Sequence, residues 1–362
     1  MKVPMSLTFF KNFPVPRYMN IDDGVGVDLS EVSLRFVRLA HHDGKFELED
    51  FGEYPLPEGT ISFGQIKNPV ALKEVLARFK KEHEVNFVHV SLPESLAYLA
   101  EMEISSVKNS ELYESIEIQL EEHIPIKAVD SVFDYQVIET EKNKPGVITV
   151  LVSAIPKDIA SSYVNVFKEA GITILTLEQD SSALVRSVIP KGSPETSMIL
   201  DLGRIKTGIY IVSHGATFFV SDIDIGEKNF IDTLMKGLNL SEGEAKNIVN
   251  NLHKGEVLSD EANKIISSIF NDIKEGVDKH FVYWHSYRDK NGMKREHINR
   301  VILCGSGASL FGLKDYLLAG LRTPVDVANV WENVFSFDST IPKIPFCDAL
   351  LYSTAIGLAL YS

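Results

Sequence analysis

Residues 25–39, VGVDLSEVSLRFVRL, run from apolar residues into Asp28, through a short polar turn, and into a second apolar run. Residues 198–212, MILDLGRIKTGIYIV, repeat this plan, with Asp201 in the place of Asp28. Two strand-like runs joined by a polar turn predict a β-hairpin. Because the same hairpin opens two halves of the chain, we expect an internal duplication.

Length and composition set the limits of the interpretation. A chain of 362 residues is too long for one ordinary core, so two domains are expected. The net charge of −14 argues against nucleic acid as a ligand, since that usually needs a basic face. Two cysteines, Cys304 and Cys347, predict a reducing compartment without a disulfide framework. No run reaches the roughly 18 apolar residues that a spanning helix needs.

The two hairpin turns are candidates for a phosphate and magnesium site. Backbone N–H groups of a tight turn can face phosphate oxygens, and an aspartate can hold Mg²⁺ through its waters. In the second turn Thr207 could add a hydroxyl group. Taken singly, each hairpin is better explained by an aspartate that caps its own turn. The duplication favours the site, because two such turns can grip one phosphate chain from opposite sides.

A third element lies near the end of the chain, where the strand-like run VILC leads into Gly305, Ser306 and Gly307. Small residues allow a ligand to approach the backbone, and the start of the following helix offers free N–H groups. The spacing is neither that of a dinucleotide-binding turn nor that of a P-loop. Alone, this turn is a weak signal.

The order of these three elements resembles the phosphate-1, phosphate-2 and adenosine order of the actin, Hsp70 and FtsA superfamily. Within it the chain resembles the PilM family of type IV pilus assembly proteins over almost its whole length. Five stretches carry the resemblance, and together they are much more specific than any one of them. They are FGEYPLPEGTI (51–61), ELYESIEIQLEEHIPIKAVDSVFDYQVI (111–138), AGITILTLEQDSSALVRSV (170–188), CGSGASLFGLKDYL (304–317) and AIGLALY (355–361).

The resemblance implies an α/β, actin-like fold, which is a duplicated ribonuclease H-like fold of two domains with an inserted β/α subdomain. It also implies ATP and Mg²⁺ as cofactors, with Asp28 and Asp201 on the metal. The expected divisions are a tail (1–20), a first half (21–190) with an insertion at about 96–171, and a second half (191–362) with a helical part at about 228–296 and a last helix (348–361) that returns to the first half. The implied nucleotide-binding residues are Asp28, Ser30, Ser33, Asp201, Gly203, Thr207, Gly305, Ser306 and Gly307.

The resemblance further implies a cytoplasmic scaffold at the inner face of the membrane, which binds the cytoplasmic tail of a PilN-like inner-membrane protein in a groove formed partly by the insertion. Hydrolysis of ATP is expected to be weak or absent. Two alternatives stay open: an active ATPase or phosphotransferase, for which the sequence names no catalytic residue, and an FtsA-like filament protein that self-associates. The tail of residues 1–20 is better explained as a flexible segment that docks on its own protein, although Phe9, Phe10 and Phe13 could instead contact a membrane or a partner.

The chain departs from the family pattern at several positions. Ser30 and Ser306 stand where the family often has glycine. In EAKNIV (244–249), Lys246 and Val249 occupy the positions at which the family often has glutamate and lysine near the adenine. The second hairpin keeps the family's Asp201, Gly203 and Thr207, so nucleotide binding is still expected.

Overall fold

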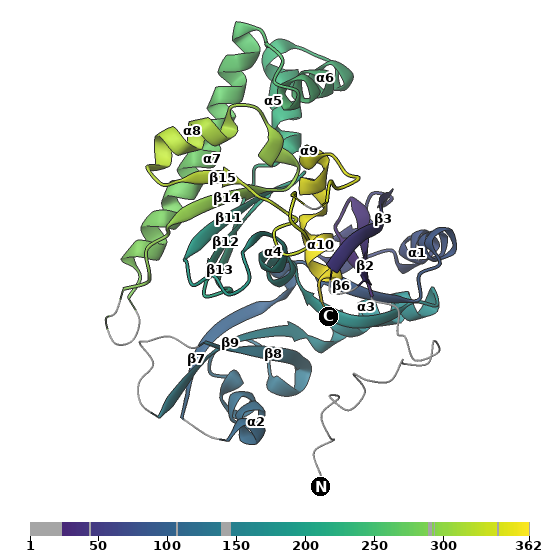
Figure 1. Ribbon diagram of the computed structural model, residues 1–362, viewed down its shortest axis with the longest axis vertical. Helices are drawn as coiled ribbons and strands as arrows, with labels where there is room; N and C mark the ends of the chain where they lie inside the picture. The colour runs from purple at the N-terminus through teal and green to yellow at the C-terminus, as the bar shows by residue number, and fades with distance from the viewer. Residues whose placement is uncertain are drawn as a thin grey trace.

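The computed structural model describes residues 24–42, 45–105, 108–138, 146–288, 292, 294–338 and 340–361 (Figure 1). The N-terminal tail of residues 1–20 lies outside these ranges. None of the helices in the described ranges is long and apolar enough to cross a membrane.

Two five-stranded mixed sheets form the centre of the molecule, and their topologies are the same. In each, the first strand pairs antiparallel with the second and parallel with the fourth, and the third and fifth strands lie at the two edges. This confirms the predicted duplicated, actin-like α/β fold. The first sheet comprises β1 (Val25–Leu29), β2 (Ser33–His42), β3 (Lys45–Pro55), β6 (Phe87–Leu92) and β10 (Thr173–Gln179), and the second comprises β11 (Ser197–Leu202), β12 (Thr207–Ser213), β13 (Ala216–Ile223), β14 (Arg300–Cys304) and β15 (Val325–Val327).

Strand register shows how closely the two hairpins correspond. Leu29 pairs with Leu34 in the first hairpin, and Leu202 pairs with Thr207 in the second. Thr207 is therefore the structural counterpart of Leu34, the first residue beyond the turn, and the two aspartates occupy equivalent places two residues before the turn.

Two helices pack together between the two sheets (Figure 1). They are α4 (Asp180–Val188) and α10 (Ser353–Ala359), and α10 also packs onto β1 and β2. This packing is so close that a Cβ at Gly26 would overlap the carbonyl oxygen of Ala355, and one at Gly357 would overlap that of Ala183. Glycine is needed at both positions because backbone meets backbone there.

The remaining helices cover the outer faces of the sheets. Helix α1 (Pro69–His83) begins at the N-cap Asn68, whose side chain accepts a hydrogen bond from the backbone of Ala71, and it buries a stripe of apolar residues at helical spacing. In the second half, α7 is 27 residues long and rises with α5 and α6 above the sheet (Figure 1). The other elements are α3 (Lys157–Glu169), α5 (Glu227–Leu238), α6 (Glu242–His253), α7 (Asp260–Ser286), α8 (Leu313–Leu321), α9 (Phe346–Ala349), β4 (Ile61–Ser62) and β5 (Gln65–Ile66).

A smaller unit is inserted after β6. Its three strands, β7 (Tyr98–Ser105), β9 (Val147–Pro156) and β8 (Ser131–Ile138), lie in that order, with β9 in the middle. Helix α2 (Asn109–Leu120) covers one face of this sheet with Leu112, Ile116 and Leu120. Helix α3 instead packs into the core of the first half. We therefore propose that the insertion comprises residues 98–156, which is shorter than the range of about 96–171 expected from the sequence.

The inserted sheet also touches the second half of the chain. Arg295 forms an ion pair of 2.6 Å with Glu101 on β7, and its guanidinium lies over the rings of Phe218, Trp284 and Tyr287. Beside this pair, a small apolar cluster joins Ile138 and Leu151 of the inserted sheet to Ala216 of β13. The insertion is thus in contact with both halves of the molecule.

Candidate functional site

Four carboxylates come together between the two hairpins, and we call them the carboxylate cluster. Asp28 is near the end of β1, and Asp201 is near the end of β11. Asp180 is the first residue of α4, and Glu94 follows β6. All four side chains are partly buried. The structure thus brings the two predicted metal residues together and adds two carboxylates that the sequence did not indicate.

The carboxylates of the cluster lie within range of one another's charges. Burial, followed by the charge of Asp28, raises the pKa of Asp201 to about 6. The pKa of Asp180 is raised well above its ordinary value by burial and then by the charges of Asp28 and Glu94. Arg35 lies opposite Asp28 in the strand register of the hairpin. Its positive charge lowers the pKa of both Asp28 and Asp201 and so opposes the effect of burial. Excess negative charge away from water makes this a place where a cation would be stabilised.

The donor chemistry of the carboxylate cluster fits Mg²⁺ held through waters. Its groups are carboxylate oxygens, which hard divalent cations prefer, and the buried Oδ1 of Asp180 has no hydrogen-bond partner among the described residues. In the same ranges, no group of three or more His, Cys, Asp or Glu side chains is arranged to hold a metal directly.

The Gly-rich turn that follows β14 packs directly against the second hairpin. Gly305 has a φ of 77°, and a Cβ there would overlap the Oδ1 of Asp201. A Cβ at Gly307 would lie 2.8 Å from the Cβ of Leu202, and the Ser306 hydroxyl donates to the Leu202 carbonyl at 3.2 Å. Glycine is therefore needed at 305 and 307 for contact between two turns of the protein, whatever ligand lies nearby.

Most hydroxyl groups predicted to contact a nucleotide have partners within the chain. The Ser30 hydroxyl donates to the Ser33 carbonyl at 3.0 Å and accepts from the Ser33 amide at 3.1 Å, so it closes its own turn. The Thr207 hydroxyl donates to the Ile225 carbonyl at 2.6 Å. The hydroxyl of Ser33 is buried and has no hydrogen-bond partner among the described residues. The Gly203 amide bonds to the carbonyl groups of its own turn. Nucleotide contact by these residues stays a prediction.

The two positions of α6 that depart from the family pattern, Lys246 and Val249, have a structural explanation. Val249 is 1 % exposed and belongs to the main core of the second half. Lys246 is exposed and forms an i,i+4 ion pair of 2.6 Å with Glu242. Val249 therefore contributes to packing, and Lys246 is engaged on the surface of the helix.

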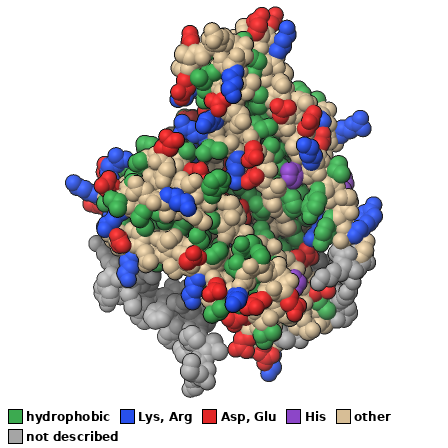
Figure 2. Space-filling model, turned by 180° about the vertical axis from the view of Figure 1, so that it is seen from behind, with side chains coloured by type: hydrophobic (Ala, Val, Ile, Leu, Met, Phe, Trp, Pro, Cys, Tyr) green, Lys and Arg blue, Asp and Glu red, His purple; other side chains and the backbone are tan. Residues whose placement is uncertain are grey.

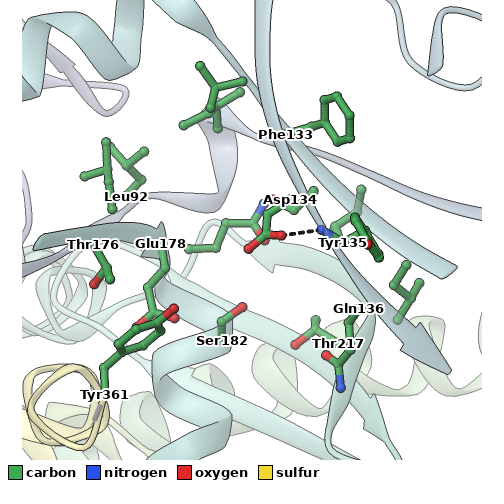
Figure 3. A pocket seen from close by; sticks show the side chains of 17 residues that line it. Leu92, Phe133, Asp134, Tyr135, Gln136, Thr176, Glu178, Ser182, Thr217 and Tyr361 are labelled. Atoms are coloured by element: carbon green, nitrogen blue, oxygen red, sulfur yellow. Dashed lines mark hydrogen bonds between the residues drawn. The ribbon is translucent and has the colours of Figure 1, made fainter. Parts of the chain in front are cut away.

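A groove of about 400 Å³ lies on the other side of the β10–α4 junction (Figure 3). Two of its walls are edge strands, since β8 is at the edge of the inserted sheet and β10 at the edge of the first sheet. Thr217, from β13 of the second half, lies at one end near Gln136, and Tyr361 lies at the other (Figure 3). The full lining is Leu92, Leu99, Val132, Phe133, Asp134, Tyr135, Gln136, Leu151, Ser153, Ile155, Thr176, Leu177, Glu178, Gln179, Ser182, Thr217 and Tyr361.

Sequence reasoning missed Asp180 and the groove residues Gln179 and Thr217. In LEQDSSALV, an aspartate before an apolar helical run is what a helix start usually looks like. Only the fold shows that this particular helix start lies between the carboxylate cluster on one side and the groove on the other. Glu94 was equally inconspicuous, in a short turn after a proline.

Comparisons with known proteins agree with this architecture. The family model described as type IV pilus assembly protein PilM matches residues 26–362. A chain of a solved PilM–PilN type IV pilus biogenesis complex is 17% identical, with a TM-score of 0.74, over 93% of this chain and 98% of that one. The ethanolamine utilization protein EutJ from Carboxydothermus hydrogenoformans is 14% identical, with a TM-score of 0.53, over 94% of this chain and 89% of that one.

A third solved structure with the same fold is MreB5 of Spiroplasma citri bound to ADP. It is 12% identical, with a TM-score of 0.53, over 93% of this chain and 95% of that one. At these identities, the structural likenesses establish the fold, and the family model decides the family. The family model extends over 26–362, nearly the whole chain, and the chain therefore belongs to the PilM family of type IV pilus assembly proteins.

Proposed function

We propose that this chain is a cytoplasmic scaffold of type IV pilus assembly, which binds an extended segment of a PilN-like membrane protein in the groove and a nucleotide at the carboxylate cluster. The observation that carries the proposal is the groove itself, which lies between two edge strands, β8 and β10. Edge strands present unpaired backbone groups, and an extended segment can bind to them while its side chains enter apolar pockets. The related structure is a PilM–PilN complex, which supports a partner of this class.

Surface charge narrows the choice of ligand. Acidic side chains gather at the lower end of the molecule in Figure 2, the end that bears α2 in Figure 1. The exposed glutamates of α2 contribute to this surface, and Asp134 adds a carboxylate inside the groove. Such a surface disfavours nucleic acid and an acidic segment, and it favours a neutral or basic one.

A nucleotide fits the carboxylate cluster in chemical terms. Asp28 and Asp201 would hold Mg²⁺ through its waters, and the metal would neutralise the phosphates beside the clustered carboxylates. The MreB5 structures contain ADP or AMPPNP, which supports nucleotide binding on this fold. Asp28, Ser30, Ser33, Asp201, Gly203, Thr207, Gly305, Ser306 and Gly307 remain the residues proposed to surround the nucleotide.

The groove proposal is tested by filling the groove with a side chain. Ser182 is an exposed residue of α4 that lines the groove, so Ser182→Trp should weaken binding of a labelled peptide from the cytoplasmic segment of the PilN-like partner at least tenfold. Ser161→Trp, at an exposed position of α3, is the matched control and should leave the affinity unchanged. Fluorescence anisotropy measures both. Equal affinity for the peptide in the two variants would rule out the groove as the binding site.

A second candidate function, hydrolysis of the nucleotide, is favoured by one observation. Asp180 combines an unpartnered, buried oxygen with a pKa raised by burial and neighbouring charge, which suits a group that accepts a proton from water. Steady-state phosphate release tests this function. If the wild type releases phosphate, Asp180→Asn should abolish the release while nucleotide binding persists. An unchanged rate in the variant would exclude Asp180 as the base.

A further inference from the structure

Two buried polar side chains line the groove without a partner of their own. Gln179, on β10, is 6 % exposed, and Thr217, on β13, is 8 % exposed. The Nε2 of Gln179 and the Oγ1 of Thr217 make no hydrogen bond within the part of the chain that the structure describes. Neither atom is exposed to solvent, so each side chain has to rotate towards the groove to meet a ligand there. Because buried polar atoms of folded proteins are nearly always paired, two unpaired ones in residues that line one groove point to a ligand that pairs them after such a rotation.

These two residues come from different halves of the molecule. Gln179 ends the edge strand of the first sheet, whereas Thr217 lies near the start of the edge strand of the second. The second half is held beside the groove by the contact of Ala216 with Leu151 and by the ion pair between Arg295 and Glu101. A ligand that bonds to both unpaired atoms would therefore join the two halves.

The same junction faces the carboxylate cluster. Gln179 lines the groove, and the next residue, Asp180, belongs to the carboxylate cluster and has an unpartnered oxygen of its own. Adjacent residues of one rigid helix start thus serve two sites. A ligand that fixes the position of Asp180 relative to Asp201 also fixes the first half, which carries Gln179, relative to the second half, which carries Thr217.

We propose that Gln179 and Thr217 donate hydrogen bonds to main-chain carbonyl oxygens of the segment in the groove, and that this makes binding in the groove and at the carboxylate cluster cooperative. The inference rests on the proposed function of the groove. An extended segment beside the edge strands presents carbonyl groups along its length, which suits two donors. Because the ligand spans both halves, a bound nucleotide that fixes their relative position strengthens binding in the groove, and the reverse holds equally.

The test uses Thr217→Val, which removes the hydroxyl with almost no change in shape. The probe is a labelled synthetic peptide of the N-terminal cytoplasmic segment of the PilN-like partner, titrated by fluorescence anisotropy with and without Mg·ATP. The variant should bind the peptide about threefold to tenfold more weakly, as expected for one lost hydrogen bond. In the wild type, Mg·ATP should increase the affinity for the peptide about fivefold or more, and in Thr217→Val this factor should fall towards one. Thr217→Ser keeps the hydroxyl and should restore both.

Thr60→Val is the matched control, because Thr60 is also fully buried with an unpartnered hydroxyl but lies outside the groove. Both valine variants should melt at a slightly higher temperature than the wild type, since each removes an unpaired buried group. Only Thr217→Val should lower the affinity for the peptide. If the wild type binds the peptide and Thr217→Val binds it equally well, this inference alone is overturned. Absence of wild-type binding would overturn the proposed function and the inference with it.

Discussion

Replacing Asp201 by asparagine tests whether the carboxylate cluster opposes folding until a cation neutralises it. Burial and the charge of Asp28 raise the pKa of Asp201 from 3.8 to about 6. The folded chain therefore binds the proton more tightly than the unfolded chain, so stability falls as the pH rises between these values and the loss is complete above them. Each pKa unit corresponds to about 1.4 kcal/mol, so the ionised group costs about 3 kcal/mol at pH 7.5 and about 1.5 kcal/mol at pH 5.

The assay is thermal unfolding of the wild type and Asp201→Asn at pH 5 and pH 7.5, with a chelator and without nucleotide. We expect the variant to be the more stable protein at both values. Its advantage at pH 7.5 should exceed that at pH 5 by about 1.5 kcal/mol, or about 2 °C in melting temperature for a chain of this length. Mg·ATP should then stabilise the wild type more than the variant, which lacks one carboxylate proposed to hold the metal.

Asp272→Asn, at an exposed position of α7, is the control, and it should show no such difference between the two pH values. The electrostatic reasoning would be refuted if Asp201→Asn lowered stability equally at both. That result would mean that the carboxylate is held by structural bonds that the amide cannot replace.

Two further substitutions test the contacts that hold the parts of the molecule together. Glu101→Gln removes the charge that pairs with Arg295 and should lower the free energy of unfolding by about 0.5–1 kcal/mol, measured by urea titration, because the pair is partly exposed, with 34% of the Glu101 side chain accessible. A neutral effect would show that the ring contacts alone hold Arg295. Gly357→Ala should destabilise by about 3 kcal/mol or more, because the added methyl group overlaps the Ala183 carbonyl oxygen. Gly243→Ala, in open space on α6, should be neutral or slightly stabilising, and similar melting temperatures for the two alanine variants would contradict the close packing.

The sequence predicted the features that depend on local pattern. The alternation of apolar residues around Asp28 and Asp201 is a property of the strands themselves, so both hairpins and their duplication could be recognised before any contact was known. The Gly-rich turn at 305–307 was recognised as a third element of the site, and the structure places Gly305 against Asp201. The two hairpins are equivalent strands of the two sheets, so the duplication predicts that they lie opposite each other.

Features that depend on tertiary contact were missed or explained differently. Asp180 looks like any helix start until its burial among other carboxylates is known. Gly307 was expected to leave room for a nucleotide, whereas the structure shows that it leaves room for Leu202. Thr217 lies in an apolar strand, and its unpaired hydroxyl is visible only when the groove has been formed from two halves of the chain.

The packing of α10 onto β1 has a consequence for how this chain is made on the ribosome. Gly26 of the first strand meets Ala355, so helix α10 covers a sheet whose first strands are synthesised about 330 residues earlier. At about 5–20 residues per second, the interval between the end of α4 and the end of α10 is on the order of 10–35 s. During that time the apolar residues on this face of the first sheet have no final partner. We therefore expect chaperones that bind nascent chains to associate with the first half until the last helix emerges.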